Sequence, residues 1–591
     1  MIRHIPAVAA LGAALALTAP ATAVATVPQT STAATAATAT TAAAAWAAGT
    51  RAHLVITAPG DTSAVRTAVA ANGGSVFASY DAIGVIVAHS ASAGFASAMR
   101  GVPGVQQVGA TRTSDVPADA YNPALPQSPA QSPTTLAESL TRWDMTQIKA
   151  DRAWAVTTGS AAVKVGVLDT GVDDLHQDIA PNFNAADSVS CAYGKADTRA
   201  GAWRDVGTHG THVAGTIAAA KNGKGVIGVA PGVKISSVRI AEPGTSLFFA
   251  ENTICGFMWA GDHGFKVTNN SYYTDPWQFN CPDNADQAAI IEGVRRAQEY
   301  AERRGSLQIA AAGNSNLDLA NKTVDTESPN DSTPVRRTIT NACLDIPTEL
   351  PGVVTVSAMG KGNVKASYSN YGNGVIDIAA PGGDGTSGVY STLPGGKYGN
   401  MNGTSMASPH VAGVAALMAS ADPAATPADI RSRLGVQAVD VACPSDSRCA
   451  GTTTKNGFFG EGQTDALKAV SGTTPPPGPF FETTTDVAIA DNATAESPLT
   501  VSGVSGNAPA ALKVGVEIVH SYRGDLVLSL VAPDGTVYPL EDFADNDGTD
   551  NVSKTYTVDA SAEAANGTWK LRVRDGATQD TGRIDGWNLT F

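Results

Sequence analysis

Three separate segments contain the residue types needed for nucleophilic catalysis. They are VLDTGVDDLHQD around Asp169, DVGTHGTHVAG around His209 and YGNMNGTSMASPHVAG around Ser405. A serine hydroxyl becomes a strong nucleophile when an imidazole takes its proton and a carboxylate orients that imidazole. Alone, a serine at a helix start is usually an N-cap, and an aspartate can cap a turn. The three residues together predict acyl transfer rather than three unrelated structural roles.

The elements expected around these residues would bring them to one edge of a sheet. Residues 163–169, VKVGVLD, predict a buried strand that ends at Asp169. Its carboxylate would emerge at the carboxyl edge of the sheet, where open α/β folds bind ligands. His209 and Ser405 each begin a helix of small residues. Pro409 lies early enough in its helix that we expect its missing N–H to cost little.

Residues 136–470 are predicted to form one α/β domain with a parallel sheet flanked by helices. Strands that are apolar on both faces alternate with helical segments, a pattern typical of a parallel sheet covered on two sides. The expected strands are 233–240, 266–271, 307–313, 352–358 and 375–380, and the expected helices are 212–220, 252–264 and 285–304.

The regions on either side of this domain are predicted to form separate domains and linkers. Residues 51–115 predict a small α+β domain, and residues 116–135 a Pro-rich linker that is open to cleavage. A second Pro-rich linker at 471–480 precedes residues 481–591, whose short strands and turns predict an all-β sandwich. Five strands are expected there, at 513–520, 525–533, 554–560, 568–575 and 586–591.

The amino-terminal segment predicts export. Residues 1–25 have the layout of a secretory signal peptide, and residues 26–50 form a spacer rich in Ala and Thr. Residues 7–17 form an apolar run too short to span a membrane, so we expect a soluble extracellular protein without a membrane span. The net charge of −15 repels phosphate and argues against a nucleic-acid partner. The 591 residues contain six cysteines, an even number that favours disulfide bonds after export, with 15 possible pairings. Cys443 and Cys449 are close enough for a local loop.

The three motifs, in the order Asp, His, Ser, resemble those of the subtilisin family of serine proteases. The resemblance implies that Ser405 is the nucleophile, His209 the general base and Asp169 the residue that orients His209. LQIAAAGN at 307–314 resembles the oxyanion segment of that family, which makes Asn314 the expected oxyanion donor. The expected function is therefore a secreted serine endopeptidase that acts through an acyl-enzyme on protein or peptide substrates. His212 would be a packed neighbour, since the family places its catalytic histidine first in HGTHVAG.

The sequence departs from the family where substrate binds. The strand that usually reads Ser-Leu-Gly is Ser271-Tyr272-Tyr273 here, so Tyr273 would reshape the primary specificity site. Cys281 and Cys343 could bridge two loops beside the cleft. The cleavage preference is therefore not carried over from the family.

A structural calcium ion is a further expectation from the resemblance. Asp178 and the loop of residues 221–226, with Asn222, have the placement of a family calcium site. Carboxylate, amide and carbonyl oxygens suit Ca²⁺. The two lysines of the loop are unusual, and the loop is equally compatible with a solvated turn. The acidic residues 545–550 form a second candidate calcium loop.

The outer domains also have family resemblances. Residues 481–591 resemble the P domain of proprotein convertases, which packs on and stabilises the protease there. Residues 51–115 resemble the prodomains that template subtilisin folding and remain bound as inhibitors. We therefore expect a monomeric zymogen that cuts itself between about 110 and 136, with the strand and tail near residues 108–112 threaded through the cleft. The alternative is a non-catalytic secreted protein whose β-sandwich binds glycans or a partner.

Overall fold

The computed structural model describes residues 49–133, 136–139, 142–471, 480–483, 485–504, 506–544 and 547–591. The predicted signal peptide, the spacer up to residue 48 and most of the linker 471–480 lie outside these residues, as do residues 545 and 546 of the second calcium loop. All of the described residues belong to one compact unit. No helix within the described ranges is long and apolar enough to cross a bilayer.

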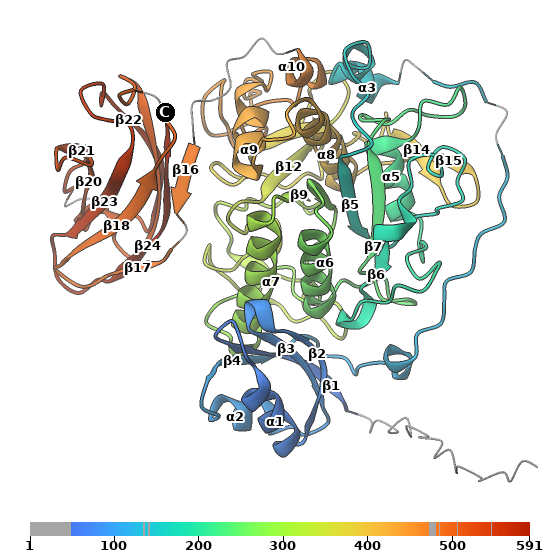
Figure 1. The fold of residues 1–591 in the computed structure, drawn as a ribbon, viewed down its shortest axis with the longest axis horizontal. Helices are drawn as coiled ribbons and strands as arrows, with labels where there is room; N and C mark the ends of the chain where they lie inside the picture. Colours follow the sequence, from blue (N-terminus) through green and yellow to red (C-terminus); the bar gives the residue numbers. More distant parts are fainter. Residues whose placement is uncertain are drawn as a thin grey trace, which may run out of the picture. The chain divides into compact units, whose positions relative to one another are not determined.

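The central domain is built on a parallel sheet of seven strands (Figure 1). Every pairing in this sheet is parallel, and the strand order is β13-β12-β9-β8-β5-β7-β6. This arrangement confirms the predicted α/β fold class. The strands are β5 (Lys164–Asp169), β6 (Val189–Ser190), β7 (Lys234–Arg239), β8 (Val267–Asn270), β9 (Leu307–Ala311), β12 (Val354–Met359) and β13 (Ile378–Pro381).

Helices cover both faces of this sheet. α5 (His209–Ala218) and α8 (Thr404–Ala421) pack in one apolar cluster with Val165 and Val167 of β5. On the opposite face, α6 (Ala250–Asp262) and α7 (Ala285–Arg303) lie side by side and pack against Leu168 (Figure 1). Adjacent residues of β5 therefore serve different cores, as the alternation of side chains along a strand requires.

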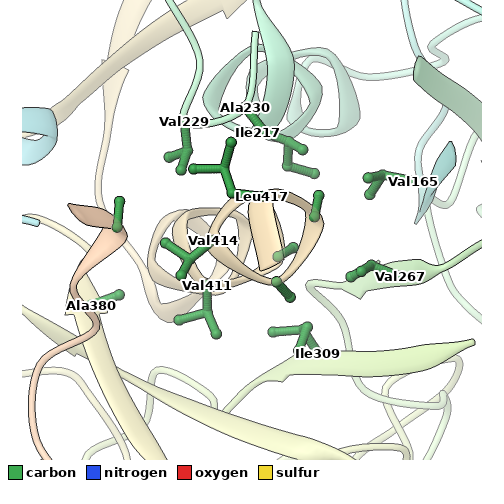
Figure 2. Close-up of a cluster of buried hydrophobic side chains, with 14 of the residues drawn as sticks. Val165, Ile217, Val229, Ala230, Val267, Ile309, Ala380, Val411, Val414 and Leu417 are labelled. Atoms are coloured by element: carbon green, nitrogen blue, oxygen red, sulfur yellow. The ribbon is translucent and has the colours of Figure 1, made fainter. Parts of the chain in front are cut away.

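α8 runs through the centre of the first core. Figure 2 shows Val411, Val414 and Leu417 of this helix surrounded by side chains of the sheet and of α5. The helix is apolar on all sides, which is the pattern of a fully buried helix. Gly413 lets Val229 approach closely, since a β-carbon there would lie 2.5 Å from the Val229 side chain. The nucleophile candidate thus sits on a helix that is almost entirely enclosed by the core.

Shorter elements of the central domain were not predicted. The β14–β15 ribbon is antiparallel and packs on α5. These additional elements are the edge strand β6, β10 (Val324–Asp325), β11 (Arg337–Thr338), β14 (Val389–Leu393), β15 (Lys397–Met401), α3 (Trp143–Gln147), α4 (Ala150–Ala153), α9 (Pro427–Val436) and α10 (Ala466–Val470). The three disulfides are Cys191–Cys255, Cys281–Cys343 and Cys443–Cys449. These three bonds confirm the expected disulfide bonding, and they include both pairings that the sequence suggested, Cys281–Cys343 and Cys443–Cys449.

Residues 51–110 form an antiparallel sheet with two helices. The strand order is β2-β3-β1-β4, and the elements are β1 (Arg51–Thr57), α1 (Ser63–Ala71), β2 (Gly74–Tyr80), β3 (Val85–Ser90), α2 (Phe95–Arg100) and β4 (Val105–Ala110). One face packs on α1 and α2, and the other joins the cluster of α6 and α7 through Leu54 and Ile56. A β-carbon at Gly109 would lie 2.5 Å from the Asp286 backbone, so β4 lies directly on the first turn of α7.

The tail after β4 does not follow the path expected from the resemblance. Thr113 and Ser114 donate hydrogen bonds to Asp331, and the Val116 N–H then donates to the Thr50 carbonyl. Among the described hydrogen bonds of residues 110–133, none involves Asp169, His209, Asn314 or Ser405. In the uncut chain this tail therefore does not cross the four candidate catalytic residues, which corrects the expectation that it threads through the cleft past them.

Residues 480–591 form the predicted β-sandwich. One sheet has the order β16-β24-β19-β22, with β17 also on β24, and the other has the order β18-β23-β20-β21. Trp569 and Trp587 fill the space between them. The strands are β16 (Phe480–Thr483), β17 (Val487–Ile489), β18 (Thr494–Val501), β19 (Leu512–His520), β20 (Leu526–Val531), β21 (Val537–Glu541), β22 (Val552–Val558), β23 (Gly567–Asp575) and β24 (Gly582–Thr590). Four of these, β16, β17, β18 and β21, were not predicted.

Candidate active site

Asp169 and His209 form a direct hydrogen-bonded pair. The Nδ1 atom of His209 lies 2.8 Å from one oxygen of the Asp169 carboxylate and 2.9 Å from the other. The carboxylate is completely buried, whereas 30% of the imidazole is exposed. Since Nδ1 faces the carboxylate, Nε2 is the nitrogen left to take a proton from a substrate-side group.

The pair sets the protonation behaviour of the imidazole. Burial lowers the pKa of His209, but the charge and hydrogen bond of Asp169, together with the charge of Asp205, outweigh burial and raise it above the ordinary value. The imidazolium is therefore favoured over the neutral ring more strongly than in a free histidine. A base that passes through a protonated state benefits from this stabilisation.

Asp205 positions the helix that begins with His209, and sequence reasoning missed it. Its carboxylate accepts hydrogen bonds from Thr170 Oγ1 at 2.8 Å and from the Thr211 N–H and hydroxyl at 3.0 and 2.6 Å. Thr170 Oγ1 in turn accepts from the Gly210 N–H at 2.9 Å. These bonds tie the end of β5 to the first turn of α5. The only local signal was an acidic residue shortly before the helix start, a common cap position.

Ser405 is the second residue of α8 and is half-buried. Its Oγ lies 3.4 Å from the Ser271 carbonyl, and the Ser271 hydroxyl donates to the Ser405 carbonyl at 3.0 Å. Pro409 has no N–H to donate to that carbonyl, as an ordinary residue there would. The Ser271 hydroxyl supplies the missing donor instead. The proline therefore costs the helix little stability because of this bond, and not because of its early position as predicted.

α5 and α8 pack against each other, and their first residues lie at the same carboxyl edge of the sheet. His209 is bonded to Asp169 at the end of β5, and Ser405 to Ser271 just after the end of the parallel neighbour β8. His209 is the first residue of α5 and Ser405 the second of α8. No described hydrogen bond joins the His209 ring to the Ser405 hydroxyl. Such bonds are often long before substrate binds and shorten in the complex.

Asn314 and the Ser405 N–H face the same small space. The Asn314 Oδ1 atom accepts from the Thr404 N–H at 2.8 Å and from its hydroxyl at 2.9 Å, so Nδ2 is the free end of the amide. A β-carbon at Gly403 would lie 3.6 Å from both the Nδ2 and Oδ1 atoms of Asn314 and 3.6 Å from the Ser405 nitrogen. Both donors therefore border the volume that glycine leaves open. An oxyanion needs two such donors.

Asn370 holds the turn that carries Asn314, and it too was missed from sequence. Its buried side chain accepts from the N–H groups of Ser315 and Leu317 and donates to the Ala312 carbonyl. Gly313 has a φ of +96°, and a β-carbon there would lie 2.4 Å from Asn370 Nδ2. Glycine is required at 313 on both grounds.

The predicted substrate-binding residues have different environments. Ser271 is hydrogen-bonded to Ser405, as described above. The Tyr272 ring is 7% exposed and stacks on Phe248, so it belongs to the core rather than to an open pocket wall. The Tyr273 hydroxyl accepts a hydrogen bond from Asn330 at 2.9 Å. Of the two tyrosines, Tyr272 therefore has a core environment, and residues 271–273 follow β8 rather than extend it.

His212 is buried behind this site. Its Nε2 lies 3.0 Å from the Val389 carbonyl, and burial lowers its pKa to about 4. It stays neutral and packed at physiological pH, as expected.

Asp178 and Asn222 do not fit the expected calcium ion. One Asp178 oxygen accepts from Asn222 Nδ2 at 3.2 Å, and the other accepts from the Val226 N–H at 3.0 Å and the Tyr398 hydroxyl at 2.8 Å. The Asn222 oxygen accepts from Lys224. Ca²⁺ needs six to eight oxygen ligands, whereas protein donors already surround these oxygens. The described ranges contain no group of three or more His, Cys, Asp or Glu side chains that could hold a metal. No catalytic step is assigned to a metal here.

Comparison with known proteins gives independent matches to both large domains. Residues 160–462 match the Subtilase family, and residues 509–591 match the Proprotein convertase P-domain. The chain is 30% identical over 506 residues to the extracellular basic protease of Dichelobacter nodosus, which covers 75% of each chain. It is also 58% identical over 123 residues to leupeptin-inactivating enzyme 1 of Streptomyces exfoliatus. This match covers 20% of this chain and only 28% of that protein.

A solved structure shares the fold. The epidermin leader peptide processing serine protease of Staphylococcus aureus matches with a TM-score of 0.56 and 20% identity, over 72% of this chain and all of that chain. These features define the class of subtilisin-like serine peptidases. They are the sheet, the three motifs and the matches to known proteins. The chain belongs to the subtilase family, and a proprotein convertase P-domain follows its subtilase domain.

The hydrogen bond from Tyr398 to Asp178 predicts a measurable contribution to stability. Tyr398→Phe leaves the buried carboxylate short of one donor, so we expect the free energy of unfolding to fall by about 1–3 kcal/mol. The matched control is Tyr390→Phe, because Tyr390 stacks on Tyr398 but its hydroxyl has no hydrogen bond to a described residue. Denaturant titration with and without CaCl₂ measures both. Equal stability of Tyr398→Phe and wild type would contradict this account, and so would restoration by calcium.

Proposed function

We propose that this protein is a secreted serine endopeptidase in which Asp169, His209 and Ser405 act as the catalytic triad. The observation that carries the proposal is the buried Asp169–His209 pair at the same sheet edge as the start of α8. Asn314 supports the same assignment, because its free amide end and the Ser405 N–H border one space.

The proposed reaction proceeds through an acyl-enzyme. Ser405 Oγ attacks the carbonyl carbon of a peptide bond while His209 Nε2 takes the hydroxyl proton. The imidazolium, stabilised by Asp169, gives that proton to the leaving amine, and the C–N bond breaks. Water then attacks the ester, with His209 again taking and returning a proton, and the acid product leaves.

The proposed oxyanion donors are Asn314 Nδ2 and the Ser405 N–H. They would receive the negative charge that develops on the carbonyl oxygen in each tetrahedral state. Ser271, Tyr272 and Tyr273, which directly follow β8, are proposed as the segment along which substrate binds, with Tyr273 as the side chain that shapes the pocket.

The remaining proposal concerns biosynthesis. Residues 1–25 would direct export, residues 51–115 would act as an intramolecular inhibitor of residues 136–470, and the P domain would stabilise the mature enzyme. Because Thr113 and Ser114 are anchored to Asp331, the maturation cut is expected beyond them, between about 115 and 136. The uncut tail must leave its observed path to reach Ser405, or a second molecule must cut it.

A fluorophosphonate probe tests the catalytic proposal directly. Such a probe is expected to label the processed wild-type protein and not Ser405→Ala, because it reacts only with an activated serine. Peptide mapping should place the label on Ser405. Absence of labelling in a correctly folded wild-type protein would instead favour the alternative of a non-catalytic binding protein.

Asn314→Ala should lower turnover about 10²–10³-fold with little change in KM, the loss known when a subtilisin loses such a donor. The control is Asn321→Ala, an exposed asparagine further along the same loop. Steady-state kinetics on one peptide substrate measure both variants. Unchanged turnover of Asn314→Ala would remove this residue from the mechanism.

Ser405→Ala should accumulate as an uncut precursor of about the size of the signal-cleaved chain. Wild type should yield a shorter form and a small fragment, because the nucleophile would belong to the same protein. Mass spectrometry of both proteins from a protease-free host gives the cut site. Equal cutting of Ser405→Ala would show that another protease matures this chain.

A further inference from the structure

An arginine of the amino-terminal domain is buried in an acidic pocket of the catalytic domain. The Arg112 side chain is 2% exposed. Its Nη1 and Nη2 donate to the two oxygens of Glu242 at 3.1 and 2.6 Å, and Nη2 also donates to Glu251 at 2.5 Å. The guanidinium carbon lies 3.7 Å from the centre of the Phe249 ring. Two carboxylates and an aromatic face thus enclose one planar cation.

The pocket itself belongs to the catalytic domain. Glu242 follows β7, Phe249 precedes α6 and Glu251 lies in its first turn. Both glutamates are almost fully buried, at 2% and 0% exposed. The second oxygen of Glu251 is buried and makes no hydrogen bond to any described residue. The pocket therefore has acceptor capacity beyond what Arg112 uses.

The pocket adjoins the proposed active site. The Ile240 N–H, two residues before Glu242, donates to the Asp169 carbonyl at 3.0 Å. Phe248, next to Phe249, stacks on Tyr272 with 5.0 Å between ring centres, and Ser271 is bonded to Ser405. The tail residues after Arg112 contact Asp331, whose neighbour Asn330 donates to Tyr273. Arg112 and its tail therefore lie beside residues 271–273, the segment proposed to bind substrate.

We propose that Glu242, Glu251 and Phe249 form a specificity subsite that binds an arginine side chain of the peptide substrate in the processed enzyme. Arg112 occupies this subsite in the precursor. The inference rests on the proposed peptidase function and adds a substrate class to it. Because the expected maturation cut lies after Arg112, the substrate arginine is placed on the amino-terminal side of the scissile bond.

Charge explains why the pocket would select a cation once the amino-terminal domain leaves. Both carboxylates are buried with Arg112 in the precursor, and removing Arg112 leaves these two neighbouring like charges without their counter-ion, which is unfavourable. A guanidinium restores the bidentate pair with Glu242 and the contact with the Phe249 face. A lysine ammonium lacks the planar fork, so it matches this geometry less well. A neutral side chain of the same shape leaves both charges uncompensated.

The test compares arginine with its uncharged isostere citrulline in the processed wild-type enzyme. A peptide library with every residue varied upstream of the cut first identifies the position at which arginine is enriched. Paired peptides with arginine or citrulline there are then expected to differ in kcat/KM by about 30-fold or more. Equal kcat/KM values, or no arginine enrichment at any upstream position, would overturn the inference. Absence of all cleavage by wild type would instead overturn the proposed peptidase function.

The variant Glu242→Gln/Glu251→Gln keeps the shape of the pocket and removes both charges. For this variant, the ratio of kcat/KM on the arginine peptide to kcat/KM on the citrulline peptide should fall to within a few-fold of one. The control Glu302→Gln removes a carboxylate that pairs with Arg431 elsewhere in the domain, and it should keep the wild-type ratio. A wild-type ratio in the double variant would overturn the assignment. If the double variant does not mature, Glu251→Gln alone should lower the ratio, and the wild-type comparison decides the inference on its own.

Discussion

The buried charge of Asp169 is the constraint on which the candidate active site depends. A carboxylate with no solvent exposure is tolerated only when it is paired and hydrogen-bonded. The fold provides His209 as the partner and the Thr170 N–H as a further donor at 2.7 Å. Asp205 then fixes the helix that carries His209, so the end of one strand and the start of the next helix form a single hydrogen-bonded unit.

The nucleophile side of the site is held by a different set of bonds. α8 lies in the centre of the core, which leaves Ser405 little freedom to move. Ser271 replaces the donor that Pro409 lacks, and Thr404 orients the Asn314 amide by occupying its oxygen. These bonds satisfy polar groups at the start of the helix. They also connect Ser405 to residues 271–273, which are proposed to bind substrate, and to the proposed oxyanion donor.

Local pattern was enough to predict the parallel sheet, the sandwich and the positions of the three motifs. Strands buried on both faces have a distinct composition, and Asp169 ends one of them. Asn370 was missed because it bonds to backbone groups that the fold, not the local sequence, brings near. Asp205 was missed because its bond to the Thr170 hydroxyl joins residues 35 apart in the chain. The donors that surround Asp178 were not foreseen for a similar reason. Tyr398 is 220 residues away in the chain, and only the β14–β15 ribbon brings its hydroxyl to that carboxylate.

The most direct measurement of the central claim is the pH dependence of fluorophosphonate labelling in wild type and Asp169→Asn. His209 must be neutral to act as base, so labelling should rise with pH around a midpoint above 6.5, the ordinary histidine value. Asp169→Asn removes the charge that raises this pKa and leaves burial, which lowers it. The account predicts a midpoint at lower pH and a plateau rate reduced by about 10⁴. An unchanged midpoint and rate would contradict it.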